Sequence, residues 1–213
     1  MPDAAYLTLG GEGSSRYEEK KSVFLGFARP VTSEGEAISW IDSIRRRYPD
    51  ARHHVSASRL RDGNLTRFTD DREPAGTAGM PTLDVLRNKD LTDCAICVVR
   101  YFGGTLLGTG GLVHAYGSAA SDAVNDAGIV EMQQRLSFTL TLTYADFPRV
   151  TPLLASCGAT VTDTAFGENV TLSGTVRTSD TDALSLSLTD ATAGRVSPEW
   201  GEVSYFPVPK TNN

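Results

Sequence analysis

The chain has 213 residues, 40% of them hydrophobic and 22% charged, which is enough to bury the cores of one or two globular domains. Its net charge of −6 argues against nucleic-acid binding by the chain as a whole, and no run approaches the roughly 20 apolar residues of a membrane span. The first residues carry no signal-peptide pattern and three cysteines do not suit a disulfide scaffold, so we expect a cytoplasmic protein with no membrane partner.

Hydrophobic periodicity and turn residues divide the first part of the chain into strands and helices. Residues 1–14 are polar and rich in glycine, which predicts a flexible N-terminus. Ser33 and Glu36 have the spacing of a helix capping box, and Pro49 follows the last apolar position of that helix. The expected elements are strand 16–30, helix 33–48, strand 53–60, strand 65–69, helix 81–88, strand 95–102 and helix 110–127.

Composition changes near residue 135, and the remaining chain is rich in threonine. Its pattern predicts strand 136–144, helix 147–157, strands 161–165 and 170–177, helix 181–192 and strand 195–206. This βαββαβ order is that of the ferredoxin-like fold. The sequence therefore predicts an α+β protein with an N-terminal domain over 15–131, a ferredoxin-like domain over 136–209 and a tail over 210–213.

A glycine-rich turn between the predicted strand 95–102 and the following helix is the most informative motif. Its glycines are Gly103, Gly104, Gly108, Gly110 and Gly111. Glycines let backbone N–H groups approach a ligand closely, and a helix N-terminus adds unpaired donors and partial positive charge, so the turn suits an anion such as phosphate. Arg100 before the turn and His114 one helical turn after it can add charge. The alternative is a tight turn that only packs helix against sheet.

A second loop, over residues 70–79, combines glycines with charged side chains. We predict that it contributes to the same anion site through Asp71, Glu73, Gly76, Thr77 and Gly79. Asp71 and Glu73 could also pair with Arg100 and hold the two loops together. No motif couples these carboxylates to a nucleophile, so we predict no catalytic residues, no metal ion and no cofactor.

Positive charge is concentrated in one segment of this acidic chain. Residues 45–72 contain eight arginines and four aspartates, a net charge of +4. Such a patch fits local binding of a polyanion, and we expect four of its side chains around the anion site: Arg52, His54, Arg59 and Arg67. A solvated helix end and loop is the alternative, since cations are favoured in the last turn of a helix in any case.

Cys94 and Cys97 form a CxxC, but in a strand-like run. Positions three apart in a strand point to opposite faces, and no second cysteine or histidine pair completes a zinc site. We therefore predict two buried cysteines that act as small hydrophobic side chains.

Residues 70–81 and 100–116 together resemble the signature of the IMPACT/YigZ family. The first matches the family's DDGEPSGTAGxP and the second its RYFGGxxLGxGGLxRAY, and residues 20–24 fit its opening Lys-Ser-x-Phe. The resemblance covers most of residues 15–130. The chain has Arg72 where the family usually has Gly, Ala75 where it has Ser and His114 where it often has Arg, so a hydroxyl and a permanent charge are missing from the presumed site.

The resemblance implies an N-terminal domain similar to the fourth domain of elongation factor G and a C-terminal domain similar to its fifth. It also implies a non-enzymatic nucleic-acid- or ribosome-binding protein linked to regulation of translation. Eukaryotic members act in a kinase pathway through an extra N-terminal domain, which we do not expect here because the motif region begins near residue 15. In this interpretation Arg100→Ala and Gly110→Val should weaken RNA binding and leave the fold intact.

Two other classes of function stay open. The chain could be an enzyme acting on a nucleotide or a phosphorylated small molecule, since a glycine-rich loop at a helix N-terminus also serves kinases. It could also be a protein-interaction module that works through its acidic C-terminal domain, where residues 136–213 hold four basic and eight acidic side chains. The sequence predicts no oligomeric state.

Overall fold

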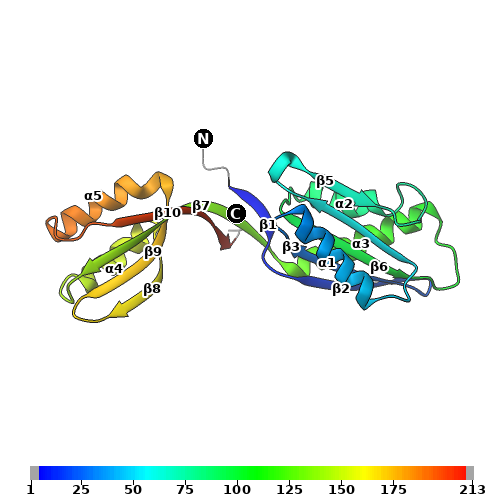
Figure 1. Cartoon of the computed structure of the whole chain (residues 1–213), viewed down its shortest axis with the longest axis horizontal. Coiled ribbons are helices and arrows are strands. Elements are labelled where there is room, and N and C mark those ends of the chain that lie inside the picture. The colour runs from blue at the N-terminus through cyan, green and yellow to red at the C-terminus, as the bar shows by residue number, and fades with distance from the viewer. Residues whose placement is uncertain (1–4, 210–213) are drawn as a thin grey trace. The chain divides into compact units, whose positions relative to one another are not determined.

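The computed structural model describes residues 5–209, which form two compact units, Tyr6–Glu131 and Met132–Val208 (Figure 1). The predicted α+β fold is confirmed. Residues 6–14 are not an irregular tail, because they hold strand β1 (Tyr6–Leu9) and the start of the next strand. The rest of the predicted flexible N-terminus, residues 1–4, and the predicted tail, 210–213, lie outside the described residues.

The N-terminal unit is a five-stranded antiparallel sheet in the order β2-β3-β6-β4-β5. The central strand β6 is buried along almost its whole length, as its continuous apolar sequence predicts. The elements of this sheet and the helices that cover it are β2 (Gly13–Glu19), β3 (Ser22–Pro30), α1 (Glu34–Arg47), β4 (His53–Arg59), the short 3₁₀ helix η1 (Asp62–Asn64), β5 (Thr66–Thr69), α2 (Gly79–Asn88), β6 (Cys94–Tyr101) and α3 (Gly108–Ala127).

The prediction of one strand over 16–30 is wrong, because β2 and β3 form a hairpin there. Glu19 pairs with Ser22, and Lys20 and Lys21 between them have φ angles of +46° and +66°. This is the geometry of a two-residue type I′ turn, which usually carries Asn-Gly. A Lys-Lys pair gives no turn signal in a sequence.

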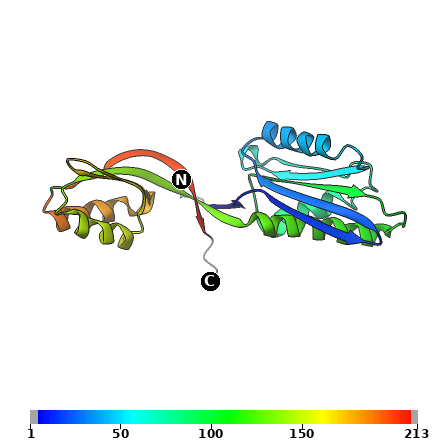
Figure 2. The same cartoon turned by 90° about the horizontal axis from the view of Figure 1, so that it is seen from below.

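Helices cover the two faces of the sheet unequally (Figure 2). Helix α1 packs Ile41 and Ile44 on one face, against Cys97 and Val99 of β6. Helices α2 and α3 cover the other face in a larger core that includes Cys94. Cys94 and Cys97 therefore lie buried on opposite faces, as the strand pattern predicts.

The start of α1 follows the predicted capping pattern with one change. Ser33 Oγ accepts a hydrogen bond from the backbone N–H of Glu36 at 3.2 Å. The Glu36 carboxylate accepts from the backbone N–H of Thr32 at 2.8 Å, one residue before the N–H that a capping box uses. This exchange fixes the chain direction between β3 and α1.

The C-terminal unit has the strand order β10-β7-β9-β8, which is the ferredoxin-like arrangement. Leu140, Leu154, Leu172 and Leu184 form part of its core between the sheet and the two helices. Its elements are β7 (Ile129–Leu142), α4 (Phe147–Ser156), β8 (Thr160–Phe166), β9 (Val170–Arg177), the 3₁₀ helix η2 (Thr178–Asp180), α5 (Thr181–Thr192) and β10 (Glu199–Pro209). Strand β7 begins in the N-terminal unit, where β1 also lies and pairs with it.

Candidate anion-binding site

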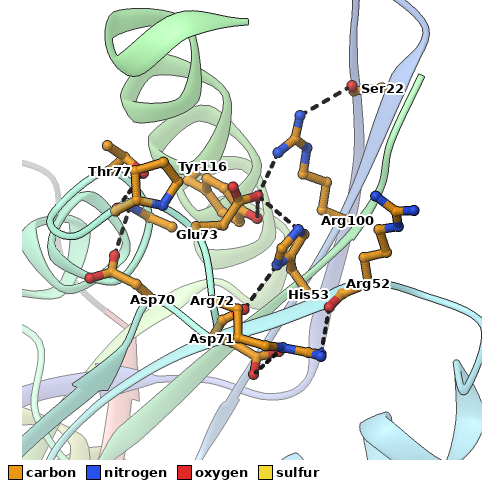
Figure 3. Close-up of polar contacts among 12 residues, drawn as sticks. Ser22, Arg52, His53, Asp70, Asp71, Arg72, Glu73, Thr77, Arg100 and Tyr116 are labelled. Carbon is orange, nitrogen blue, oxygen red and sulfur yellow. Dashed lines mark hydrogen bonds and ion pairs between the residues drawn. The ribbon is translucent and has the colours of Figure 1, made fainter. Parts of the chain in front are cut away.

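The two predicted loops meet at one end of the N-terminal sheet. Arg100, near the end of β6, pairs with Phe24 of β3 on one side and with His53 of β4 on the other. The loop from β5 to α2 and the loop from β6 to α3 both reach this end, so residues far apart in the chain come together there (Figure 3).

A buried ion pair ties the loops together. Arg100 Nη1 donates to Glu73 Oε1 at 2.5 Å, and the two side chains are only 6% and 4% exposed. The Tyr116 hydroxyl of α3 donates to the same oxygen at 2.8 Å. Burial, and then the Glu73 carboxylate, raise the pKa of Tyr116 far above its usual range, so this hydroxyl stays protonated and donates.

One nitrogen of the Arg100 guanidinium has no hydrogen-bond partner among the described residues. Nη2 of Arg100 is 3.5 Å from Ser22 Oγ, whereas the nitrogen without a partner is the buried Nε. A buried N–H without a partner costs about 1–3 kcal/mol. The guanidinium carbon lies 5.4 Å from the ring centre of Phe24 and 5.7 Å from that of Phe102, so aromatic faces share its charge.

His53 completes the cluster, and its hydrogen bond to the backbone decides which ring nitrogen carries the hydrogen. Its Nδ1 is 2.9 Å from the backbone carbonyl of Asp71, and a carbonyl only accepts, so Nδ1 carries the hydrogen. Its Nε2 then lies 3.7 Å from Glu73 Oε1 (Figure 3). In the neutral ring this nitrogen offers a lone pair, and in the protonated ring it adds a positive charge beside Glu73.

This cluster forms part of the wall of a pocket of about 400 Å³. The polar wall consists of Arg52, His53, Arg72, Glu73 and Arg100. The apolar wall consists of Pro74, Phe102, Leu106, Leu107 and Leu112, and the first residues of α3, Gly108 and Thr109, complete the lining. The volume lies in the range of small-ligand pockets, and three of the five polar residues are arginines.

The glycines of the β6–α3 loop have different roles. Gly104 and Gly108 have φ angles of +86° and +73°, which favour glycine. A Cβ on Gly103 would overlap the backbone of Lys21, so this glycine serves the packing of the loop on the β2–β3 hairpin. A Cβ on Gly111 would press on Leu107, whereas one on Gly110 would meet nothing within 4 Å. The fold therefore gives no reason for glycine at position 110.

The start of α3 is open to a ligand. Leu107 occupies the cap position and provides no side-chain hydrogen bond to the first turn. The first N–H groups of a helix have no partner within the helix and favour an anion. Gly108 and Thr109 face the pocket directly from this turn.

The loop over 70–79 is organised by Asp70, which is not among the predicted site residues. Its carboxylate accepts from the backbone N–H groups of Gly76, Ala78 and Gly79 at 2.7–3.0 Å. Burial raises the pKa of Asp70, but the three backbone donors outweigh it and leave this pKa below its usual value. Its signal in the sequence is an aspartate that precedes a glycine-rich helix start.

The predicted residues of this loop shape it and do not all reach the pocket. Gly76 has a φ of +76°, and a Cβ on Gly79 would lie 2.8 Å from the backbone of Thr69. Thr77 Oγ1 donates to the carbonyl of Pro74 at 2.7 Å. Asp71 does not pair with Arg100, because its carboxylate accepts from the backbone N–H of His54 at 2.6 Å.

Strand geometry places three further predicted residues away from the pocket. His54 follows His53 and so lies on the face of α1, with Nε2 3.0 Å from the Tyr48 carbonyl. Arg67 lies on the same face and pairs with Glu34 of α1. Arg59 is six residues from His53, about 20 Å along β4, and donates to the Leu91 carbonyl.

His114 is also outside the pocket lining. It is exposed on α3, with its Nδ1 3.2 Å from the Tyr17 hydroxyl of β2. Of the predicted basic residues, only Arg52 and Arg100 line the pocket. His53, Phe102 and Tyr116 are not among the predicted site residues. For Phe102 and Tyr116 the available signal in the sequence is their position within the glycine motif.

Among residues 5–209, the structure contains no cluster of three or more metal-ligating side chains and no helix long and apolar enough to cross a membrane.

Comparison with known proteins identifies both units. The Impact N-terminal domain matches residues 20–124, and a domain of unknown function, DUF1949, matches residues 140–195. The fold and these matches define a two-domain protein whose glycine-rich site lies in the Impact domain. The chain belongs to the IMPACT family, as its two motifs predict.

The relatives include bacterial proteins of similar length. IMPACT family member YvyE of Bacillus subtilis is 32% identical over 203 residues, which cover 95% of this chain and 94% of the relative. An IMPACT family member of Haemophilus influenzae is 34% identical, with 91% and 95% covered. IMPACT family member YigZ of Escherichia coli is 37% identical over 66% of this chain and 70% of its own. A crystal structure described as a hypothetical protein is 30% identical, with a TM-score of 0.60 over 95% of this chain and 99% of that one.

Proposed function

We propose that this IMPACT family protein is a non-enzymatic RNA-binding protein linked to regulation of translation, and that the pocket of the N-terminal domain receives a nucleotide of a single-stranded RNA. The observation that carries the proposal is the composition of that pocket. Arginines and an open helix N-terminus form one part of it, and exposed apolar side chains form another. Single-strand binding proteins combine these same two elements, a positive groove and a stacking surface.

Arg52 and Arg72 are the cations placed to meet phosphate. Both side chains are exposed, and Arg52 makes no ion pair in the described part of the chain. Arg72 donates through Nη2 to the backbone carbonyl of Arg52 at 2.8 Å and lies 4.0 Å from the Asp71 carboxylate, which fixes its side chain beside the start of β4 (Figure 3). Arg100 also lines the pocket, but its charge is paired with Glu73, so its main part is to hold the two loops of the site together.

Phe102 and Leu106 supply the surface for a base. They are 41% and 83% exposed, so their apolar surface is accessible to a ligand in the pocket. A base stacked on an aromatic ring contributes about 1–3 kcal/mol to binding. The charge of Arg100 near the Phe102 ring strengthens such a platform.

The link to translation rests on family membership and on the resemblance to elongation factor G domains. The yeast protein called Protein IMPACT homolog is 31% identical over 123 residues. The chain is acidic overall, so an RNA-binding pocket fits a protein that contacts RNA at one local site and not over its whole surface.

A second candidate function is an enzyme that acts on a nucleotide or a phosphorylated small molecule. The observation in its favour is His53, whose Nε2 lies in the pocket beside Glu73 and can accept a proton when neutral. Turnover of a nucleotide or sugar phosphate that is lost in His53→Asn would support this function in place of the first.

The first test is fluorescence anisotropy with a labelled single-stranded RNA octamer over a salt series, together with co-sedimentation with ribosomes. Arg52→Ala/Arg72→Ala should weaken RNA binding and reduce the slope of log affinity against log salt by about 1.4, since each phosphate contact on a single strand contributes about 0.7. Arg87→Ala/Lys89→Ala removes two charges at the end of α2, the exposed Arg87 and the half-buried Lys89, and is the control of equal charge change. Absence of RNA binding by the native chain at low salt would refute the proposal.

A further inference from the structure

We infer that Lys20 and Lys21, at the tip of the β2–β3 hairpin, form a second phosphate subsite beside the pocket, so that the site holds at least two successive phosphates of one RNA strand. This inference rests on the proposed RNA-binding function. It adds two binding residues that the glycine motif and the 70–79 loop do not include.

The backbone of this turn does not favour lysine. Lys20 and Lys21 have φ angles of +46° and +66°, in the left-handed region that L side chains rarely adopt. Asn-Gly is the preferred pair for the type I′ turn that joins Glu19 to Ser22. The chain therefore holds two bulky charged residues in a turn where other residues would be more stable.

Both lysines are available to a partner. Their side chains are exposed, and neither makes an ion pair in the described part of the chain. The two acidic residues of the same hairpin have other contacts: Glu18 pairs with Arg16 at 3.0 Å, and Glu19 accepts from the Tyr17 hydroxyl at 3.5 Å. The turn thus presents two positive charges that the hairpin does not neutralise.

The hairpin tip is attached directly to the pocket. Ser22 Oγ accepts from the backbone N–H of Gly103 at 3.1 Å and lies 3.5 Å from Arg100 Nη2. Gly103 has no room for a Cβ because the backbone of Lys21 lies against it. The turn therefore sits on the loop that leads into α3, and this loop supplies part of the pocket lining.

The spacing of the two sets of cations suits a polyanion. Strand β3, which follows the turn, is separated from β4 only by β6. Two strand spacings are about 10 Å, so the lysines, which precede β3, and Arg52, which precedes β4, lie on opposite sides of β6 at this end of the sheet. A strand that enters the pocket at one nucleotide would meet the two sets with successive phosphates.

The test is Lys20→Asn/Lys21→Gly, which supplies the preferred turn residues and removes both charges. Its melting temperature should be equal to or above that of the native chain, while its affinity for the RNA octamer falls and its salt slope decreases by about 1.4. Lys20→Arg/Lys21→Arg should retain the native salt slope. Arg87→Ala/Lys89→Ala should leave RNA binding unchanged.

Uridine 5′-monophosphate, which fits the pocket alone, separates the two subsites. Its binding should be unchanged in Lys20→Asn/Lys21→Gly, and an equal loss for monophosphate and octamer would refute a separate subsite. If Arg52→Ala/Arg72→Ala loses RNA binding but Lys20→Asn/Lys21→Gly leaves the salt slope for the octamer unchanged, this inference is overturned and the proposed function stands. No octamer binding by the native chain would overturn both.

Discussion

Replacing Arg100 by alanine should destabilise the N-terminal domain by about 3–5 kcal/mol, the usual cost of removing one partner of a buried ion pair. Glu73, which is 4% exposed in the native chain, would keep the Tyr116 hydroxyl as its one close donor, since His53 Nε2 is 3.7 Å away. A carboxylate needs more donors than this when it is removed from water. The loss of apolar contact between Arg100 and Phe24 adds to the cost.

Urea denaturation followed by tryptophan fluorescence measures this change in the domain concerned. Trp40 lies in α1 of the N-terminal unit and Trp200 in β10 of the C-terminal unit, and the chain has no other tryptophan. In a Trp200→Phe background the signal reports the N-terminal domain alone, for which two-state analysis is appropriate. At a typical slope of about 1–3 kcal/mol/M, the midpoint should fall by more than 1 M.

A double-mutant cycle supplies the control. Glu73→Gln keeps an oxygen that accepts from Tyr116 but removes the charge that faces Arg100, so it should also be destabilising. Arg100→Ala/Glu73→Gln should cost clearly less than the sum of the two single changes, because neither partner is left as an unpaired buried charge. A loss below about 1 kcal/mol for Arg100→Ala, or strict additivity in the cycle, would refute the buried ion pair as the element that joins the loops.

Three further predictions test the surroundings of the site. Burial raises the pKa of Asp70, but three backbone donors outweigh it, so the pKa in the folded chain lies below the usual 3.8. The ionised carboxylate therefore stabilises the fold fully above pH 3.8, and this stabilisation is lost as pH falls through the folded pKa. Asp70→Asn should reduce the dependence of the free energy of unfolding on pH, measured by urea denaturation between pH 2 and 6. Burial raises the pKa of Cys94 and of Cys97 to about 12, so Ellman's reagent at pH 8 should label neither until the chain unfolds, and rapid labelling of both would contradict the packing. Gly103→Ala should lower the melting temperature, because a Cβ there overlaps the backbone of Lys21. Gly110→Ala should raise the melting temperature, because alanine stabilises a helix by roughly 0.5–1 kcal/mol relative to glycine. A higher melting temperature for Gly103→Ala than for Gly110→Ala would show that the two glycines have been assigned the wrong roles.

Periodicity and turn chemistry were sufficient to predict most of the fold. The helix after Ser33 and the βαββαβ order of the second unit follow from local signals that tertiary packing reinforces. The hairpin at Lys20 and Lys21 could not be predicted, because its turn contains none of the residues that normally mark one. The same physical feature, an unfavourable residue in a left-handed conformation, is what makes this turn informative about binding.

The site was predicted as a region and less well as a set of side chains. The two glycine-containing loops do meet, and Glu73 pairs with Arg100 as one of the sequence-based alternatives expected. The sequence-based expectation that Arg100→Ala leaves the fold intact conflicts with the burial of Arg100. That burial could not be predicted, because the partner Glu73 lies 27 positions away in the chain. His53 lines the pocket and His54 does not, because strand register decides which of two neighbouring residues faces α3, and one sequence alone does not contain that register.

The position of β6 in the middle of its sheet has a consequence for how the chain folds during synthesis. Strands β3 and β4 are both made before β6, yet each pairs with β6 and not with the other. At roughly 5–20 residues per second, several seconds pass between the emergence of β3 and that of β6. During this interval the β2–β3 hairpin keeps an unpaired edge, and the domain acquires its core only when one late strand inserts between two earlier ones. A nascent chain halted before Cys94 should therefore depend on chaperones, and one halted after the end of α3 should resist proteolysis in its N-terminal domain.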